Sequence, residues 1–577
     1  MRRLIRGGVF AALAMPAVSA GQPAAPEPDP GVAPAPAVAP PSPVIDEARI
    51  RELVDRELAR VLTERAAKEA AERAAKEIAD KESAASDEPG EVHGASGFMD
   101  TRLAFTFSNE NVLGKPGQTV PSVPGWRFGR PSALGVLFFD SYDTRYSGFE
   151  TLSHAVMYRD YSHGHLEAEA GLVLRIDDLS QAHLDLSDDG SYLTLTDWKD
   201  PTHRDPTRIS LTAFPVSADR FRLGYSYRLS WGGNPEYRRA SSSVPGVKLQ
   251  YDGPSSYAFV GAKSATIVDP KDGQDKAALG VLAGAGIDPI PMLRLEINGG
   301  YFDRGYNELP DVQRAKVRLY GASAQASIHH GMPLRSSLDY RLYKFSGESV
   351  GGLFAPEQYP GGLSWLAQSE FTMIGQTLKD PEAAGSTVTQ TGKAGDLNVR
   401  VKIDRIRLRL DLSYRDLGFI LHSQPSLPAY EDFPKAYSTS ADYFAAIGVD
   451  NNWGDWLTLG LIAGVEKPAT LTSPSGIPGA ETGAMGTVTA VVRDNNVDTL
   501  ITILPSGKRA VRQYALKGTA KLDFAKIFAA VVEVFYSRDG NQTRDRRACG
   551  DSEQCPLEHQ YGEFNQLGVN VTLQARF

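Results

Sequence analysis

The last twelve residues, Gln566–Phe577, constrain the fold of this chain more than any other stretch. Apolar residues alternate there with polar or small ones, and the alternation ends at a C-terminal aromatic residue. Successive side chains of a strand point to opposite faces, so this period of two places one face against an apolar medium and the other against water. The apolar set is Leu567, Val569, Val571, Leu573, Ala575 and Phe577.

Similar alternation recurs through most of the chain after residue 97. Each candidate strand runs about 9 to 11 residues, the length that crosses a bilayer at a tilt. The clearest after the terminal one is Phe221–Trp231. The others include 99–107, 166–176, 279–287, 293–301, 397–403, 406–414, 457–465, 514–522 and 528–536.

Short and long links alternate between these candidates, an asymmetry that is typical of barrels with short periplasmic turns and long extracellular loops. The short links are 216–219, 252–255, 288–291, 403–405 and 524–526, and the long ones are 177–206, 232–244, 347–363, 378–394, 420–437 and 539–562. About 20 candidates are found, plus a hairpin at 488–504. If 98–108 and 364–377 are plug, loop or extension segments, 18 strands remain, within an accepted range of about 16 to 20.

The terminal strand resembles the C-terminal signature of Gram-negative outer-membrane β-barrels. In that family a terminal Phe and alternate apolar residues are read by the barrel-assembly machinery. The resemblance implies an all-β, porin-like antiparallel barrel over 98–577, in contact with outer-membrane lipid. It also implies an assembly signal formed by Val569, Val571, Leu573, Ala575 and Phe577.

The first 97 residues have a different composition. Residues 1–20 carry three arginines, a short apolar run and Val18-Ser19-Ala20, which predicts a signal peptide. Residues 21–44 are rich in Pro and Ala and predict a disordered tether. Residues 45–86 predict a charged, Ala-rich helix, either a single spacer or a coiled coil, and 87–97 a polar hinge. We expect this extension in the periplasm, and some phosphate- and polyanion-selective porins resemble it loosely in carrying a helix before the barrel.

Composition and motifs exclude several classes. The formal net charge of -9 is not that of a nucleic-acid-binding protein. Ten scattered histidines show no metal-ligand spacing, and no catalytic or cofactor-binding motif occurs in a fitting context, so we expect no enzyme, cofactor or metal. Cys549 and Cys555 lie in a long loop and predict a disulfide in an exported protein.

Two groups of basic residues could line a pore. Rows of guanidinium groups in a narrow lumen attract anions, but they could equally pair with acidic residues of the wall. The first group is Arg400, Lys402, Arg405, Arg407 and Arg409, and the second is Arg220, Arg222 and Arg228.

Two functions are therefore considered. The first is a passive channel for small polar or anionic solutes. The second is a structural anchor, or a component of a secretion or gliding machine, with a periplasmic arm. A homotrimer, or a periplasmic or cell-wall partner bound through 21–86, is left open.

Overall fold

The computed structural model describes most of the chain after residue 91. The expected signal peptide, tether and helix lie outside the described residues, as do residues 87–91 of the expected hinge. Cys549 and Cys555 also lie outside them. The described residues are 92–108, 125–128, 153–178, 185–188, 190–226, 228–233, 244–269, 271–332, 334, 361–422, 430–454, 456–474, 486–494, 499–524, 527–547, 557–562 and 565–577.

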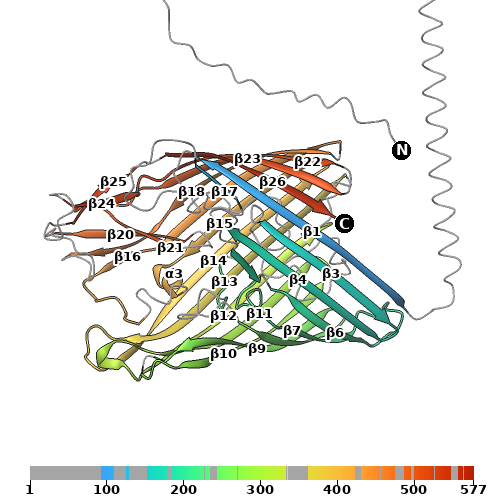
Figure 1. Ribbon diagram of the computed structural model, residues 1–577, viewed down its shortest axis with the longest axis horizontal. Coiled ribbons are helices and arrows are strands. Elements are labelled where there is room, and N and C mark those ends of the chain that lie inside the picture. The colour runs from blue at the N-terminus through green and yellow to red at the C-terminus, as the bar shows by residue number, and fades with distance from the viewer. Residues whose placement is uncertain are drawn as a thin grey trace, which may run out of the picture. The chain divides into compact units, whose positions relative to one another are not determined.

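Among these residues, 18 antiparallel strands close into one barrel. Figure 1 shows the barrel wall that these strands form. Each strand pairs with the next one along the chain, and the first pairs with the last, Asp100 opposite Arg576 and Leu103 opposite Leu573. Two short strands, β2 (Gly125–Phe128) and β5 (Asp185–Asp188), add to this sheet beside β1 and β4. A closed ring leaves no unpaired sheet edge, which is what a strand protein needs in lipid.

The ring contains every strand expected above except Phe221–Trp231. In order, its strands are β1 (His93–Ser108), β3 (Ser153–His163), β4 (Leu166–Asp178), β6 (Tyr192–Trp198), β7 (Arg208–Phe214), β8 (Gly246–Asp252), β9 (Ser256–Val268), β10 (Asp275–Ile290), β11 (Leu293–Tyr306), β12 (Lys316–His330), β13 (Leu363–Lys379), β14 (Thr387–Ile403), β15 (Ile406–Arg415), β17 (Asp442–Trp453), β18 (Leu457–Lys467), β22 (Gln513–Phe524), β23 (Phe528–Arg538) and β26 (Asn565–Arg576).

Alternation along the strands separates an apolar outside from a polar inside. In β26, Leu567 and Leu573 are exposed, whereas Asn570, Thr572 and Gln574 between them are buried. The same division holds around the ring, with exposed Leu, Ile, Val and Tyr residues on the outer face. An apolar outer surface over a polar lumen is the pattern of a barrel that spans a bilayer.

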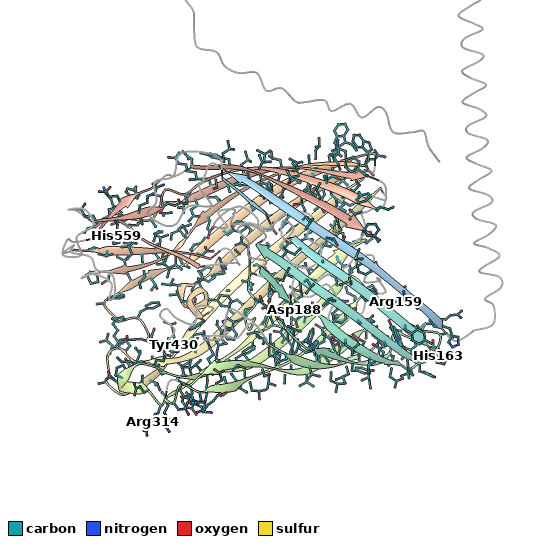
Figure 2. All side chains as sticks on the ribbon, viewed as in Figure 1. Arg159, His163, Asp188, Arg314, Tyr430 and His559 are labelled. Atoms are coloured by element: carbon teal, nitrogen blue, oxygen red, sulfur yellow. The ribbon has the colours of Figure 1, made fainter. Side chains whose placement is uncertain are left out.

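The two ends of the barrel differ. Phe577 and the turns at 164–165, 253–255, 291–292 and 404–405 mark one end, here called the short-turn end. The opposite end, the long-link end, carries η3 (Pro310–Val312) and α3 (Leu417–His422). Figure 2 shows His163 at the first end and Arg314 at the second.

A small four-stranded sheet and a hairpin also stand at the long-link end. The sheet consists of β16 (Ser438–Ser440), β19 (Ala469–Ser473), β20 (Val488–Asp494) and β21 (Thr499–Ile503), and the hairpin of β24 (Thr543–Arg547) and β25 (Leu557–Tyr561). The hairpin expected at 488–504 is thus confirmed, outside the barrel. Within the part of the chain described, no helix is long and apolar enough to cross a membrane.

Several expected boundaries were wrong. Segments 98–108 and 364–377 are wall strands within β1 and β13, and residues 93–97 of the expected hinge also belong to β1, because backbone pairing with β3 needs no large side chains. The link expected at 177–206 contains β6. The strands on either side of 378–394 run further than expected, leaving a link of 380–386.

Two links also lie elsewhere than expected. The long link ending at residue 362 joins β12 to β13 at the short-turn end, since His330 pairs with Trp365 there, rather than at the extracellular side. The supposed tight link 216–219 is part of a longer segment inside the barrel, described next.

Candidate functional site

A segment between β7 and β8 lies inside the barrel. We call residues 215–233 the crossing segment, of which residue 227 is not described. Leu223 and Trp231 exchange both backbone hydrogen bonds at 2.9 Å, so the segment doubles back as a short hairpin. The barrel strand expected at Phe221–Trp231 was therefore wrong. Its alternation is present, but side chains of both sets are buried within the barrel, Arg222 as well as Phe221.

The crossing segment reaches across the lumen. It leaves the wall between β7 and β8, and its tip residue Arg228 contacts β15 and β17, the seventh and eighth strands after β8 in a ring of 18. Arg228 Cζ lies 3.8 Å from the ring centroid of Phe444, and Arg228 Nη1 donates to Ser413 Oγ at 3.4 Å. The segment therefore spans nearly the full width of the barrel.

Apolar packing seats the crossing segment against the wall formed by β9 to β13. The ring of Trp231 lies 4.7 Å from that of Phe302, edge to face, and the ring of Phe221 lies 5.8 Å from that of Phe259. Leu223 is fully buried in the same cluster. Burial of such side chains stabilises the seated segment by about 1.5–3 kcal/mol each.

Lys263 of β9 holds the base of the crossing segment. Its Nζ donates to the backbone carbonyls of Ala218, Phe221 and Gly232 at 2.7, 2.7 and 2.6 Å. Lys263 is 1 % exposed. An ammonium group has three donors, and here each meets a backbone carbonyl, of which that of Ala218 also accepts from Phe221 N at 3.0 Å.

Glu370 of β13 and Asn298 of β11 hold the part of the segment nearer its tip. Glu370 accepts from the backbone N–H groups of Tyr225 and Ser226 at 2.9 and 2.6 Å, and Asn298 Oδ1 accepts from Gly224 N at 3.0 Å. Gly224 has φ 92, and a Cβ there would lie 2.9 Å from Glu370 Oε1. Only glycine permits this approach without strain.

The three arginines expected to face the lumen from this stretch do lie inside the barrel, on the crossing segment instead of a wall strand. Arg222 Nη2 pairs with Asp219 Oδ2 at 2.7 Å, and its Nε donates to the Asp219 carbonyl. Arg220 is buried beside Gly190, and Arg228 forms the tip.

The second basic row is divided between two strands and a turn. Arg400 and Lys402 are half-buried on the inner side of β14. Arg405 does not belong to the row, because it lies in the turn between Ile403 and Ile406 and is exposed.

Acidic partners accompany the two remaining arginines of that row. Arg407 Nε pairs with Asp450 Oδ2 at 2.7 Å, and Arg409 Nε pairs with Asp411 Oδ2. These two arginines therefore pair with acidic residues of the wall, which is the alternative that the sequence left open.

The inner wall away from the crossing segment's apolar seat is nearly charge-balanced. On the inner side of the strands from β14 round through β26 and β1 to β7, the described side chains include ten basic and eleven acidic ones. They are Arg102, Arg208, Arg400, Lys402, Arg407, Arg409, Arg415, Lys517, Lys521 and Arg576, and Asp100, Asp160, Glu167, Glu169, Asp396, Asp411, Asp442, Asp450, Glu466, Asp523 and Glu533.

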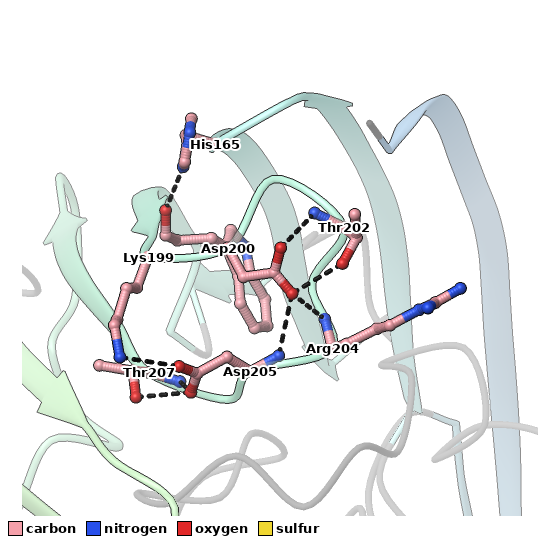
Figure 3. Close-up of polar contacts among 8 residues, drawn as sticks. His165, Lys199, Asp200, Thr202, Arg204, Asp205 and Thr207 are labelled. Atoms are coloured by element: carbon pink, nitrogen blue, oxygen red, sulfur yellow. Dashed lines mark hydrogen bonds and ion pairs between the residues drawn. The ribbon is translucent and has the colours of Figure 1, made fainter. Parts of the chain in front are cut away.

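The β6–β7 loop, residues 199–207, lies at the short-turn end, and Figure 3 shows its polar contacts. Asp200 accepts from Thr202 Oγ1 and from three backbone N–H groups, and Asp205 accepts from Thr207 and from Lys199 Nζ. These hydrogen bonds, with that from the Thr202 hydroxyl largest, hold the pKa of Asp200 well below its usual range. The Thr207 hydroxyl in turn lowers the pKa of Asp205 to about 2.

That loop also holds the first described residue. Val92 N donates to the carbonyl of Pro201, and Val92 O accepts from Gly164 N, both at 2.9 Å. The ring of His203 stacks on Trp198 at 4.3 Å, and His203 contacts the Gly164 carbonyl through Nε2. The place where residues 1–91 join the barrel is therefore fixed at the same end as Phe577.

Sequence reasoning missed Lys263, Glu370, Asn298 and the 199–207 loop. A single charged residue on a strand's polar face gives no sign that it binds a distant backbone. The repeated Asp-Pro-Thr at 200–202 and 205–207 is a visible turn signal that could have located the loop.

No protein-family model and no curated protein matches the chain. Similar solved structures include an anion-selective porin from Comamonas acidovorans, with 9% identity over 84% of this chain and 100% of that one and a TM-score of 0.34. Another is OccK11 (OpdR) of Pseudomonas aeruginosa, with 10% identity, 85% and 99% coverage and a TM-score of 0.36. The outer membrane channel DcaP of Acinetobacter baumannii shows 11% identity, 84% and 97% coverage and a TM-score of 0.34.

Proposed function

We propose that this protein is an outer-membrane channel through which small polar or anionic solutes diffuse passively, and that it has no enzymatic activity. One observation carries the proposal: a closed ring of strands presents an apolar surface outward and charged side chains inward. Such a wall is stable only between lipid outside and water or polar groups inside.

The crossing segment gives this channel its constriction. It spans the lumen from β7 to β17 and is held by buried hydrogen bonds, so a solute must pass beside it. Passage is therefore restricted to small molecules.

Planar-bilayer recording tests the channel. The purified, folded protein should produce stable conductance steps, and it should fractionate with outer membranes and migrate faster on gels before heating than after. Folded protein without conductance would contradict the channel, and recovery in the soluble periplasm would contradict the location.

A structural anchor is the second candidate, and the fixing of Val92 at the barrel rim supports it. An arm that emerges from a rigid point can transmit force from the barrel to a periplasmic or cell-wall partner. Deletion of residues 21–90 separates the two functions. A channel lacking them still conducts, whereas an anchor loses its partner in crosslinking experiments.

A further inference from the structure

We propose that an exposed group of basic residues at the long-link end binds the phosphate group of a membrane lipid. The group, here called the basic patch, consists of Lys467, Lys508, Arg509, Arg512 and Arg538. These residues lie at the ends of β18 and β23 and in the link that precedes β22. The proposal concerns the outer surface of the barrel, so it goes beyond the channel function.

Strand pairing brings three of these cations together on the outer face. β18, β22 and β23 lie side by side in the barrel wall (Figure 1). Tyr514 of β22 pairs with both Val465 and Arg538. Lys467 lies two residues beyond Val465, and Arg512 two residues beyond Tyr514, so each continues the outward-facing set of its strand. Lys467, Arg512 and Arg538 are all exposed.

The protein does not neutralise the basic patch. Among the residues that the structure describes, none of its five members forms an ion pair. The acidic residues of the three strands, Glu466, Asp523 and Glu533, are on the inner face, where Glu533 pairs with Lys517 and Asp523 with Arg576. Residues 504–512 contain no acidic side chain. An anion from outside the protein can therefore approach five positive charges without meeting a carboxylate on these segments.

Buried hydrogen bonds fix the link that carries Lys508, Arg509 and Arg512. Asn541 is fully buried, and its side chain accepts from Val511 N at 2.7 Å and donates to Val511 O at 2.9 Å. At the other end of the link, Gly507 N donates to the carbonyl of Thr487 at 3.0 Å. The basic side chains are thus attached to a backbone that is already ordered, which lowers the entropic cost of binding.

A row of tyrosines next to the basic patch favours a membrane lipid over a soluble anion. Tyr443 of β17, Tyr514 and Tyr536 are exposed on the outer face, and Lys467 Nζ lies 5.4 Å from the ring centroid of Tyr443. Exposed tyrosines of this kind mark the boundary between hydrocarbon and headgroups. The outward residues further along the strands include Leu461, Leu516 and Val534. A lipid whose acyl chains cover these apolar residues would bring its phosphate level with the cations.

Native mass spectrometry of the folded protein in a nonionic detergent tests this site. Dioleoyl phosphatidic acid is the probe, and dioleoyl phosphatidylcholine, whose choline group offsets the phosphate charge, is the matched lipid. The patch variant combines Lys467→Gln, Arg512→Gln and Arg538→Gln. A control variant removes three exposed arginines nearer the short-turn end through Arg159→Gln, Arg204→Gln and Arg405→Gln. Only protein with folded gel mobility is scored.

The native protein should bind phosphatidic acid about ten-fold more tightly than phosphatidylcholine, and added salt should weaken this preference. The patch variant should lose the preference, whereas the control variant should keep it. Equal affinities in the two variants, whether high or low, would overturn the proposal. If the patch variant does not fold, Arg512→Gln alone, which lies outside the strands, should still weaken binding by about five-fold.

Glycerol phosphate separates a lipid site from a site for soluble anions, because it carries the same phosphate without acyl chains. At equal concentration it should not displace phosphatidic acid from the native protein. Displacement would mean that the basic patch takes soluble anions, which would overturn the lipid assignment. Neither measurement requires conductance, so a barrel that binds the lipid but does not conduct would refute the channel function and leave this proposal standing.

Discussion

His422, at the end of α3, is a buried imidazole beside a buried guanidinium. It is 2 % exposed, and neither ring nitrogen has a hydrogen-bond partner among the described residues. Arg304 donates to the His422 carbonyl at 2.8 Å. Burial first, and the Arg304 charge second, lower the pKa of His422 to about 3.

The packing of α3 should therefore weaken in acid. A histidine whose pKa is lowered by folding binds its proton more readily when exposed. The stability of α3 is thus complete above the ordinary pKa of 6.5 and is lost as the pH falls from there toward about 3. Protection of α3 amides from hydrogen exchange, corrected for intrinsic rates, should fall by at most about ten-fold per pH unit.

His422→Leu supplies the comparison. It removes the imidazole and keeps an apolar side chain of similar reach, so the amide protection of α3 should change less with pH over that range than it does in the native protein. If amide protection fell equally steeply with pH in the native protein and in the variant, a group other than His422 would control the stability of α3.

Lys263 is the residue on which the seating of the crossing segment most depends. Lys263→Met keeps the aliphatic stem but removes a donor from three backbone carbonyls. The Ala218 carbonyl still accepts from Phe221 N, so the cost of about 1–3 kcal/mol each falls on the carbonyls of Phe221 and Gly232. The segment should loosen, so single-channel recordings should show larger and noisier conductance. Lys393→Met, on the exposed side of β14, is the matched control and should leave the conductance unchanged. Quiet, unchanged conductance in Lys263→Met would mean that apolar packing alone holds the segment.

Among the elements, wall strands could be predicted from sequence and the crossing segment could not. A period of two indicates that the two faces of a strand differ, and in β26 the apolar face is exposed on the outside of the barrel, as expected. In Phe221–Trp231 the same period arises although both faces are buried in protein. The Gly224 and Gly232-Gly233 positions were local signs of a turning backbone, but their partners, Glu370 and Lys263, are far away in the chain.

The candidate site was predictable only in part for the same reason. Arg407 and Arg409 were expected on the inner face and are there, but their partners Asp450 and Asp411 follow from strand register, which no local pattern specifies. Arg405 was misplaced because it lies in the two-residue turn before β15, where the alternation of a strand does not apply.

The 199–207 loop should respond to acid at a much lower pH than α3 does. The pKa values of Asp200 and Asp205 are lowered, so the stability from their carboxylates is present above about 4 and is lost as the pH falls toward about 2. The ring of His203 should separate from that of Trp198 as the pH falls through this range. The fluorescence difference between the native protein and Trp198→Phe measures it.

Substitution of the same two residues tests the loop at neutral pH. Asp200→Asn with Asp205→Asn should increase trypsin cleavage after Arg204, because the amides replace strong charged acceptors with weaker ones. Asp197→Asn, exposed on β6 nearby, should leave cleavage unchanged. Equal cleavage in both variants would show that the stacked His203 fixes the loop without the carboxylates.

At the scale of the whole molecule, closure of the ring depends on the last strand. β26 pairs with β23 over eleven residue pairs and with β1 over nine, so without it both neighbours would expose a backbone edge to lipid. Phe577 completes the pairing between β26 and β1 that closes the barrel, here called the seam. Its N–H and carbonyl both bond to Met99 at 2.8 Å, and its ring meets Phe528 at 6.3 Å, edge to face.

Removal of Phe577 should therefore separate assembly in the cell from folding in the test tube. Deletion costs two hydrogen bonds out of a long ladder, so the purified chain should still refold in detergent and regain its heat-modifiable mobility. If the terminal aromatic residue is what the assembly machinery reads, the same deletion should leave export intact but reduce folded protein in the outer membrane at least ten-fold. Phe528→Ala, which removes the ring contact and keeps the chain end, should assemble nearly normally. Normal assembly of the deletion variant in cells would refute the recognition role, and failure to refold in detergent would show that Phe577 acts instead through the stability of the seam.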